Sequence, residues 1–341
     1  MNNAPAQPAQ KYAQKDFQSD QDVRWCPGCG DYSILAQVQR VLPDLNIPRE
    51  KLVWVSGIGC SSRFPYYVQT YGIHGIHGRA AAIASGLKMA RPDLSVWVAT
   101  GDGDGMSIGG NHLIHVFRRN VGIKILLFNN QIYGLTKGQF SPTSVEGQIT
   151  ASTPYGNIDH PFNPLLLALG SGAGFVARSV DREPKNLQEV IRRAAAHRGT
   201  TFVEIYQNCN VFNDGAFSTM TDKETHDDNV LVLEHGKPLI FGKDKKKGIR
   251  LNGFTPQLVD IGADGDAGLI VHNEKDHMLA FILAGLSSMP GMPRPIGVLY
   301  AVDRPAYESD MVGQIEKVKQ SRGEGELAKL LQGGETWQIE W

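Results

Sequence analysis

The chain has 341 residues, of which 41% are apolar and 20% are charged, with 38 glycines and four cysteines. Lys and Arg number 34 and Asp and Glu number 35, so the formal net charge is −1. This balance gives no electrostatic reason to expect binding to nucleic acid or to a membrane surface. The apolar runs are too short to span a bilayer, and residues 1–16 lack the apolar core of a signal peptide. We therefore expect a cytoplasmic protein with a disordered leader over residues 1–16.

Between residues 17 and 214, short β-rich runs alternate with longer helical patterns. Several runs are apolar almost throughout, which is typical of strands buried on both faces of a parallel sheet. We predict strands over residues 51–56, 95–100, 123–129, 174–179 and 201–206, and helices over residues 32–42, 79–90, 110–119, 164–169 and 185–197. This alternation predicts a doubly wound parallel α/β sheet.

Beyond residue 214 the pattern weakens. Residues 225–228 and 243–248 are rich in charge, and residues 278–286 are apolar enough for one helix that ends before Pro290. We predict that residues 215–341 form an irregular extension, of a kind that can wrap a partner subunit.

Unusual residues follow four of the predicted strands. Strand 51–56 leads into the sequence GIGCSSR, strand 95–100 into GDGDG, strand 123–129 ends at Asn129-Asn130, and strand 201–206 precedes Asn208-Cys209. In an open parallel sheet, ligands bind at the carboxyl ends of the strands. The sequence therefore predicts a ligand site at this edge.

The GDGDG turn has the composition of a phosphate site that contains a metal. Glycines let successive N–H groups face an anion, and the helix that follows presents its positive end. Asp102 and Asp104 would repel phosphate unless a cation lay between them, and Mg²⁺ binds oxygens of this kind. Asn130 can add a neutral oxygen ligand, because one strand–helix–strand crossover separates it from Asp102. The alternative is a pair of ordinary turns.

The spacing of Gly101-Asp102-Gly103 and Asn129-Asn130 resembles the thiamine diphosphate (TPP) motif of TPP-dependent enzymes. The resemblance implies that Asp102, Asn130 and the carbonyl of Ile132 hold Mg²⁺. It also implies that the diphosphate is lined by Gly103, Asp104, Gly134 and Leu135.

The four cysteines are Cys26, Cys29, Cys60 and Cys209. A disulfide framework is not expected in a reducing cytoplasm. The Cys26-Pro27-Gly28-Cys29 spacing serves an iron–sulfur centre, a redox dithiol or half of a zinc site. Structural zinc and inert core thiols at Cys60 or Cys209 remain alternatives. Because Cys60 lies in a Gly-rich turn at the predicted cofactor edge, its place favours an electron acceptor over a purely structural zinc.

A set of motifs then identifies a family. WCPGCGDYSIL, GIGCSSRFPYY, HGIHGRA, GDGDGMSIGGNH and FNNQIYGLTKGQ, followed by Cys209, together resemble the β subunit of 2-oxoacid:ferredoxin oxidoreductases over residues 17–225. The resemblance implies that all four cysteines bind a [4Fe–4S] cluster next to TPP. It further implies cofactor contacts from Ile58, Gly59, Cys60 and Ser61, with His77 and Gly78 nearby. We interpret His74, His112 and His115 as packing residues.

Arg63 directly follows the turn that is expected to contact the cofactor, and its permanent charge suits a carboxylate. Members of the family that act on 2-oxoglutarate or on a broad range of substrates tend to have a basic residue here, whereas pyruvate-specific members tend to be apolar. The alternative is a surface arginine paired with an acid. We therefore favour 2-oxoglutarate as the substrate.

The implied reaction is the reversible, TPP-dependent oxidative decarboxylation of 2-oxoglutarate with CoA to succinyl-CoA and CO₂, with electrons passing through the cluster to ferredoxin. The α/β pattern of the chain accounts for only one sheet, that of the diphosphate-binding domain. An α subunit is therefore expected to supply the pyrimidine-binding domain in an αβ or (αβ)₂ assembly. Two alternatives remain: the same chemistry on pyruvate, branched-chain or aryl 2-oxoacids, and a non-catalytic α/β module that contains structural zinc.

Overall fold

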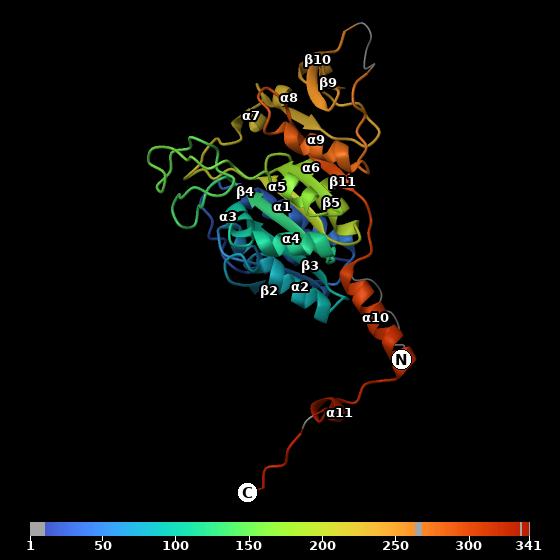
Figure 1. Ribbon diagram of the computed structural model, residues 1–341. Coiled ribbons are helices and arrows are strands. Elements are labelled where there is room, and N and C mark those ends of the chain that lie inside the picture. Colours follow the sequence, from blue (N-terminus) through green and yellow to red (C-terminus); the bar gives the residue numbers. More distant parts are fainter. Residues whose placement is uncertain (1–10, 263–267, 335, 341) are drawn as a thin grey trace.

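The computed structural model describes residues 11–262, 268–334 and 336–340. Its centre is an eight-stranded sheet in the order β2-β1-β3-β4-β6-β5-β11-β7 (Figure 1). The strands are β1 Leu52–Ser56, β2 Tyr71–His74, β3 Ser95–Gly101, β4 Ile123–Asn129, β5 Phe175–Val180, β6 Thr201–Tyr206, β7 Val230–Val232 and β11 Arg294–Ala301. The pairings from β2 through β5 are all parallel, and β11 pairs antiparallel with β5.

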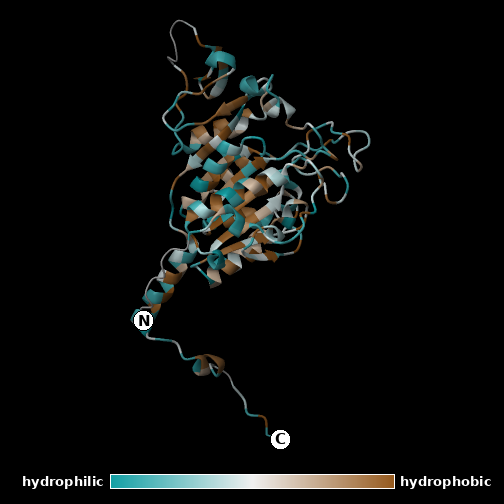
Figure 2. Ribbon diagram, turned by 180° about the vertical axis from the view of Figure 1, so that it is seen from behind, coloured by the Kyte–Doolittle hydropathy of each residue, from teal (hydrophilic) through white to brown (hydrophobic). Residues whose placement is uncertain are grey.

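Helices cover both faces of this sheet. One apolar core lies under α1 Asp31–Val41 and α6 Pro184–Ala196. The opposite core lies under α2 Ala80–Ala90, α4 Gly110–Arg119, α5 Pro164–Gly170 and α9 His277–Leu286. Strands β4, β5 and β6 are buried at every residue, and Figure 2 shows apolar residues concentrated in the body. The predicted doubly wound α/β fold is confirmed, and each end of the strands and helices predicted between residues 17 and 214 lies within one residue of an observed end.

The remaining elements of the described chain lie outside the central sheet and the helices that cover it. They are the 3-10 helices η1 Gln14–Phe17, η2 Leu42–Leu45, η3 Arg49–Lys51, η4 Ser61–Tyr66 and η5 Lys243–Lys245, the helices α3 Asp102–Met106, α7 Ser218–Thr221, α8 His226–Asn229, α10 Tyr307–Arg322 and α11 Leu327–Leu331, and the strands β8 Ile240–Phe241, β9 Lys247–Asn252 and β10 Thr255–Asp260.

The predicted disordered leader, residues 1–16, is wrong at its C-terminal end. Residues 1–10 lie outside the described residues, but η1 is regular and ends at Phe17, which is fully buried in the core beneath α1. The carbonyl of Phe17 also accepts a hydrogen bond from the N–H of Gln69. One aromatic side chain therefore anchors this segment to the domain.

The irregular extension predicted for residues 215–341 is also wrong in part. Strand β11 pairs with β5, and β7 pairs with β11, so both extend the central sheet. Strand β11 joins the sheet because its consecutive residues from Pro295 to Leu299 are buried. Strands β8, β9 and β10 form a separate antiparallel sheet. Helices α10 and α11 project from the body at the opposite end of the molecule (Figure 1).

Among the described residues, no helix combines the length and apolar character needed to cross a lipid bilayer.

Candidate cofactor site at the carboxyl edge of the sheet

The loops that follow β1, β3 and β4 enclose a cavity of about 480 Å³. Twelve of the residues predicted from the sequence line it: Ile58, Gly59, Cys60, Ser61, His77, Asp102, Gly103, Asp104, Asn130, Ile132, Gly134 and Leu135. Asp31, Tyr133, Gln139 and Gln207 also line it and were not predicted. Residues from four loops that are distant in sequence thus meet where the sheet topology places them.

Asp102 is the first residue of α3, and its side chain is buried in the cavity wall. Its Oδ2 accepts hydrogen bonds from the hydroxyls of Ser141 at 2.5 Å and Thr143 at 2.7 Å. Burial raises the pKa of Asp102 to about 6, while these two hydroxyls act in the opposite direction. Because a divalent cation favours the ionised carboxylate, this environment is chemically suited to a bound metal.

Asn130 follows β4, and both ends of its amide are oriented. Its Nδ2 donates to Oε1 of Gln207 at 2.9 Å, and its Oδ1 accepts from the N–H of Ile132 at 3.2 Å. Since the amide nitrogen is engaged by Gln207, the oxygen is the atom left to face a metal. Asp102 and Asn130 therefore fit the pair of oxygen ligands that Mg²⁺ prefers.

Asp104 has a role that sequence reasoning missed. Its carboxylate accepts hydrogen bonds from the N–H groups of Ile58 at 3.0 Å and Gly78 at 2.6 Å, and from the Thr100 hydroxyl at 2.6 Å. The Nδ1 of His77 lies 3.0 Å from the same carboxylate. Asp104 therefore lines the cavity and also holds together the loops that carry the other lining residues.

The cysteine thiols gather beside Gly134. A Cβ at this glycine would lie 3.5 Å from Sγ of Cys60 and 3.6 Å from Sγ of Cys209, so the missing side chain leaves room between them. Burial and, to a smaller extent, the charges of Asp31, Cys209 and Cys26 raise the pKa of the Cys60 thiol to about 12. Burial also raises the pKa of Cys29, with Cys60 and Cys209 among its electrostatic neighbours.

The other three thiols therefore lie within electrostatic reach of Cys60, which lines the cavity. Bound metal would favour their thiolate forms. Within the described ranges, no three His, Cys, Asp or Glu side chains converge on one point as the ligands of a single ion do.

Arg63 lies in η4, three residues after Cys60, and is half-buried. Among the residues that the structure describes, its guanidinium makes no hydrogen bond or ion pair, and it does not line the cavity. Its charge lowers the pKa of the Cys60 thiol, against the effect of burial. Arg63 is thus an uncompensated cation beside the cavity, close to the thiol group.

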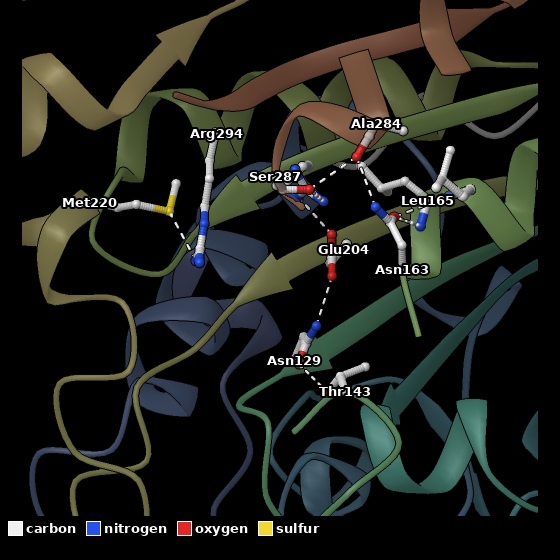
Figure 3. A network of polar contacts seen from close by, with 11 residues as sticks. Asn129, Thr143, Asn163, Leu165, Glu204, Met220, Ala284, Ser287 and Arg294 are labelled. Carbon is white, nitrogen blue, oxygen red and sulfur yellow. Dashed lines mark hydrogen bonds and ion pairs between the residues drawn. The ribbon is translucent and has the colours of Figure 1, made fainter. Parts of the chain in front are cut away.

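A buried polar network continues from the cavity wall into the sheet (Figure 3). The Thr143 hydroxyl also lies 2.9 Å from Oδ1 of Asn129, whose Nδ2 donates to Glu204 at 2.7 Å. Glu204 pairs with Arg178 at 2.7 Å, and both side chains are at most 1% exposed. Arg178 then donates to the hydroxyl of Ser287, just beyond α9, at 3.4 Å. The network links the cofactor edge to the C-terminal part of the chain.

We expect Glu204→Gln to lower the free energy of unfolding by about 3–5 kcal/mol, because it leaves the buried Arg178 guanidinium without its counter-ion. Chemical denaturation of the purified protein measures the effect. The double variant Arg178→Met, Glu204→Leu removes both charges and should recover most of the loss. Equal stability of the single variant and the unmodified protein would contradict this account of the pair.

The comparisons with known proteins agree with this geometry. Residues 54–205 match the family model described as thiamine pyrophosphate enzyme, C-terminal TPP binding domain. The chain is 50% identical to 2-oxoglutarate oxidoreductase subunit KorB of Mycobacterium tuberculosis, over 96% of this chain and 88% of that protein. The chain belongs to the β subunits of the 2-oxoacid:ferredoxin oxidoreductases.

Other members of the family support the same conclusion. The β subunit of 2-oxoacid:ferredoxin oxidoreductase 2 of Aeropyrum pernix is 37% identical over 82% of this chain and 91% of that protein. The solved structure of 2-oxoglutarate:ferredoxin oxidoreductase from Magnetococcus marinus, with 2-oxoglutarate, coenzyme A and succinyl-CoA bound, superimposes with a TM-score of 0.77 at 35% identity, covering 96% of this chain and 97% of that one.

The family resemblance predicted from the motifs is therefore confirmed. It also extends beyond residue 225, because the match to the M. tuberculosis β subunit covers nearly the whole chain. The matched TPP-binding domain spans the loops after β1, β3 and β4, which are the loops that form the cavity.

Proposed function

We propose that this β subunit, with an α subunit, forms a 2-oxoglutarate:ferredoxin oxidoreductase. In the oxidative direction, 2-oxoglutarate and CoA give succinyl-CoA, CO₂ and a proton, and two electrons pass singly through a [4Fe–4S] cluster to ferredoxin. The observation that supports the proposal is that Asp102, Asn130 and Cys60 line one cavity, with the other three cysteines within electrostatic reach of Cys60. The names of the relatives from M. tuberculosis and M. marinus support 2-oxoglutarate as the substrate.

In this proposal, Asp102, Asn130 and the carbonyl of Ile132 hold Mg²⁺ at the diphosphate of TPP. When bound, TPP supplies the electron sink for decarboxylation, and the cluster accepts the electrons. Gly103, Asp104, Gly134 and Leu135 line the diphosphate, and Ile58, Gly59, Cys60 and Ser61 contact the cofactor with His77 and Gly78. The apolar lining of the cavity excludes water from the reacting atoms.

Cys26, Cys29, Cys60 and Cys209 are the proposed ligands of the cluster. These cysteines come from the CxxC turn, the loop after β1 and the loop after β6. Gly134 lies next to the thiols of Cys60 and Cys209. A cluster held by these thiols would lie beside the cofactor cavity, because Cys60 lines that cavity. Short separation favours electron transfer over loss of the electrons to other acceptors.

The proposed α subunit supplies what the cavity lacks. The described residues that line the cavity include three aspartates, at positions 31, 102 and 104, and no glutamate that could activate the aminopyrimidine of TPP. We assign that glutamate and much of the substrate pocket to the α subunit, in a cytoplasmic αβ or (αβ)₂ assembly.

Anaerobic purification of the complex of both subunits tests the proposal. We expect a brown protein that is bleached by reductant, contains iron and sulfide, and reduces ferredoxin with 2-oxoglutarate and CoA. The isolated β subunit should bind metal but show no turnover. A colourless zinc protein would overturn the cluster assignment, and faster turnover with pyruvate than with 2-oxoglutarate would overturn the substrate assignment.

We expect Arg63→Ala to lower kcat/KM for 2-oxoglutarate about 10- to 100-fold, because a charge-assisted contact to the second carboxylate contributes about 1.5–3 kcal/mol. Pyruvate, which lacks that carboxylate, should be affected much less. Initial rates of the assembled complex with both substrates measure the change, with Arg63→Lys as the charge-conserving control. An equal loss for both substrates would show that Arg63 acts on the fold or the cluster instead.

A further inference from the structure

We propose that Gln207 is a positioning residue that joins the magnesium ligand Asn130 to the cluster ligand Cys29. The inference rests on the proposed function, which assigns these two ligands. Gln207 follows β6, is 1% exposed and lines the cavity. No motif singled it out, because its role depends on contacts across three loops.

The backbone around Gln207 fixes the orientation of its side-chain amide. Nε2 donates to the carbonyl of Asn208 at 2.5 Å. A carbonyl oxygen only accepts hydrogen bonds, so the nitrogen end of the amide must face it. The Asn208 carbonyl is itself held by the N–H of Gly30, in the turn that follows Cys29. The position of the CxxC turn therefore sets which way the Gln207 amide points.

This orientation determines that of Asn130. With Nε2 turned toward Asn208, Oε1 of Gln207 faces Asn130 and accepts a hydrogen bond from its Nδ2 at 2.9 Å. The Asn130 amide is thereby held with its oxygen available to the metal, and a rotated amide would present N–H groups, which repel a cation. Residues that orient a metal ligand in this way commonly change metal affinity 10- to 100-fold when they are removed.

The same amide reaches the cluster ligand. Nε2 of Gln207 also lies 3.2 Å from Sγ of Cys29, within the distance of a hydrogen bond to sulfur. A donated N–H···S hydrogen bond stabilises the added negative charge of a reduced cluster, and hydrogen bonds to sulfur are among the factors that set cluster potentials. Gln207 therefore raises the reduction potential of the cluster.

A second contact supports the same junction. In the loop that carries Cys209, Asn213 donates from Nδ2 to the carbonyl of Asn130 at 2.8 Å. The backbone N–H of Gln207 also donates to the carbonyl of Asn129 at 3.0 Å. The loop with the magnesium ligand and the two loops with cluster ligands are thus fastened together, with the Gln207 side chain as their shared polar contact.

The experiment compares Gln207→Leu and Gln207→Glu with a matched control in the complex of both subunits. The control is Gln37→Leu, which removes another buried glutamine amide. Gln37 bonds Arg40 and Gln188, and none of these three residues lines the cavity. Calorimetry with added TPP and Mg²⁺ measures cofactor affinity, and an EPR-monitored redox titration measures the cluster potential.

We expect Gln207→Leu to weaken TPP binding about tenfold. We also expect it to shift the one-electron reduction equilibrium of the cluster about tenfold, or ~59 mV, toward the oxidised form. Gln207→Glu keeps an acceptor for Asn130 and loses a donor to Cys29, so it should lower the potential with less than a threefold change in TPP affinity. Gln37→Leu should change neither quantity.

Two results would overturn the inference. One is a Gln207→Leu complex in which the TPP affinity and the one-electron reduction equilibrium of the cluster both stay within twofold of those of the unmodified complex. The other is a Gln207→Glu complex with an unchanged potential, which also decides the matter if the leucine variant fails to assemble. An unmodified complex without iron, sulfide or TPP binding would instead overturn the proposed function, so the two failures are distinct.

Discussion

Replacement of Asp102 by asparagine is expected to abolish turnover and to weaken Mg²⁺-dependent TPP binding at least about 100-fold. Asp102 is the one carboxylate of the proposed metal site, and loss of residues that merely orient a ligand already costs 10- to 100-fold. The asparagine keeps the volume of the side chain, and Ser141 and Thr143 can still bond to its oxygen. The lost negative charge is therefore the principal change.

Calorimetry of the complex with TPP at several Mg²⁺ concentrations measures the effect. Asp93→Asn is the control, because that aspartate is on the surface and pairs with Arg91 and Lys51 away from the cavity. Iron content should stay near that of the unmodified complex in both variants, since neither residue is a proposed cluster ligand. An Asp102→Asn complex that binds TPP normally would show that this carboxylate does not hold the metal.

Replacement of Cys209 by serine is expected to remove the cluster and with it all ferredoxin reduction. The chain has four cysteines and the proposed cluster needs each of them, so no other thiol can take the place of Cys209. TPP binding should survive, because Asp102 and Asn130 lie in other loops. The expected result is therefore a complex that keeps the organic cofactor and lacks the electron acceptor.

Iron and sulfide analysis, the visible spectrum and TPP calorimetry on the same preparation separate these two outcomes. Val211→Ala in the same loop is the matched control, because Val211 is exposed and contributes no ligand. A Cys209→Ser complex with a full complement of iron and sulfide would contradict the assignment. Loss of TPP binding together with the iron would show that the substitution disrupts the loop, and that its effect is not limited to the lost thiol ligand.

Much of the sheet could be predicted from the sequence because its central strands are buried on both faces. Burial of this kind produces continuous apolar runs such as Ile123–Asn129, and these are visible without a structure. The strand β11 was missed for a different reason: it pairs antiparallel at the far side of β5 and follows a long segment with no alternation. The edge strand β2 was missed because all of its residues, Tyr71–His74, are exposed.

At the site, the residues that could be predicted are those tied to a motif or to the end of a strand. Ser141 and Thr143 carry no such signal, since each acts through a hydrogen bond formed only when distant loops meet. Gln207 does follow a predicted strand, but its contact with Asn130 also forms only when distant loops meet. Asp31, which the structure buries fully, lies two residues after Cys29, and this position close to the cysteines was a usable signal in the sequence. The charged residues within β5 and β6 were another, because a charge in a buried strand needs a partner.

Arg178 and Glu204 are direct neighbours across β5 and β6 in the observed register. A shift of one residue between these strands would turn one charge to the opposite face and leave both without a counter-ion in the interior. The pair therefore makes a sheet with a shifted register between β5 and β6 unstable, so that the loops after these two strands begin at the same level of the sheet.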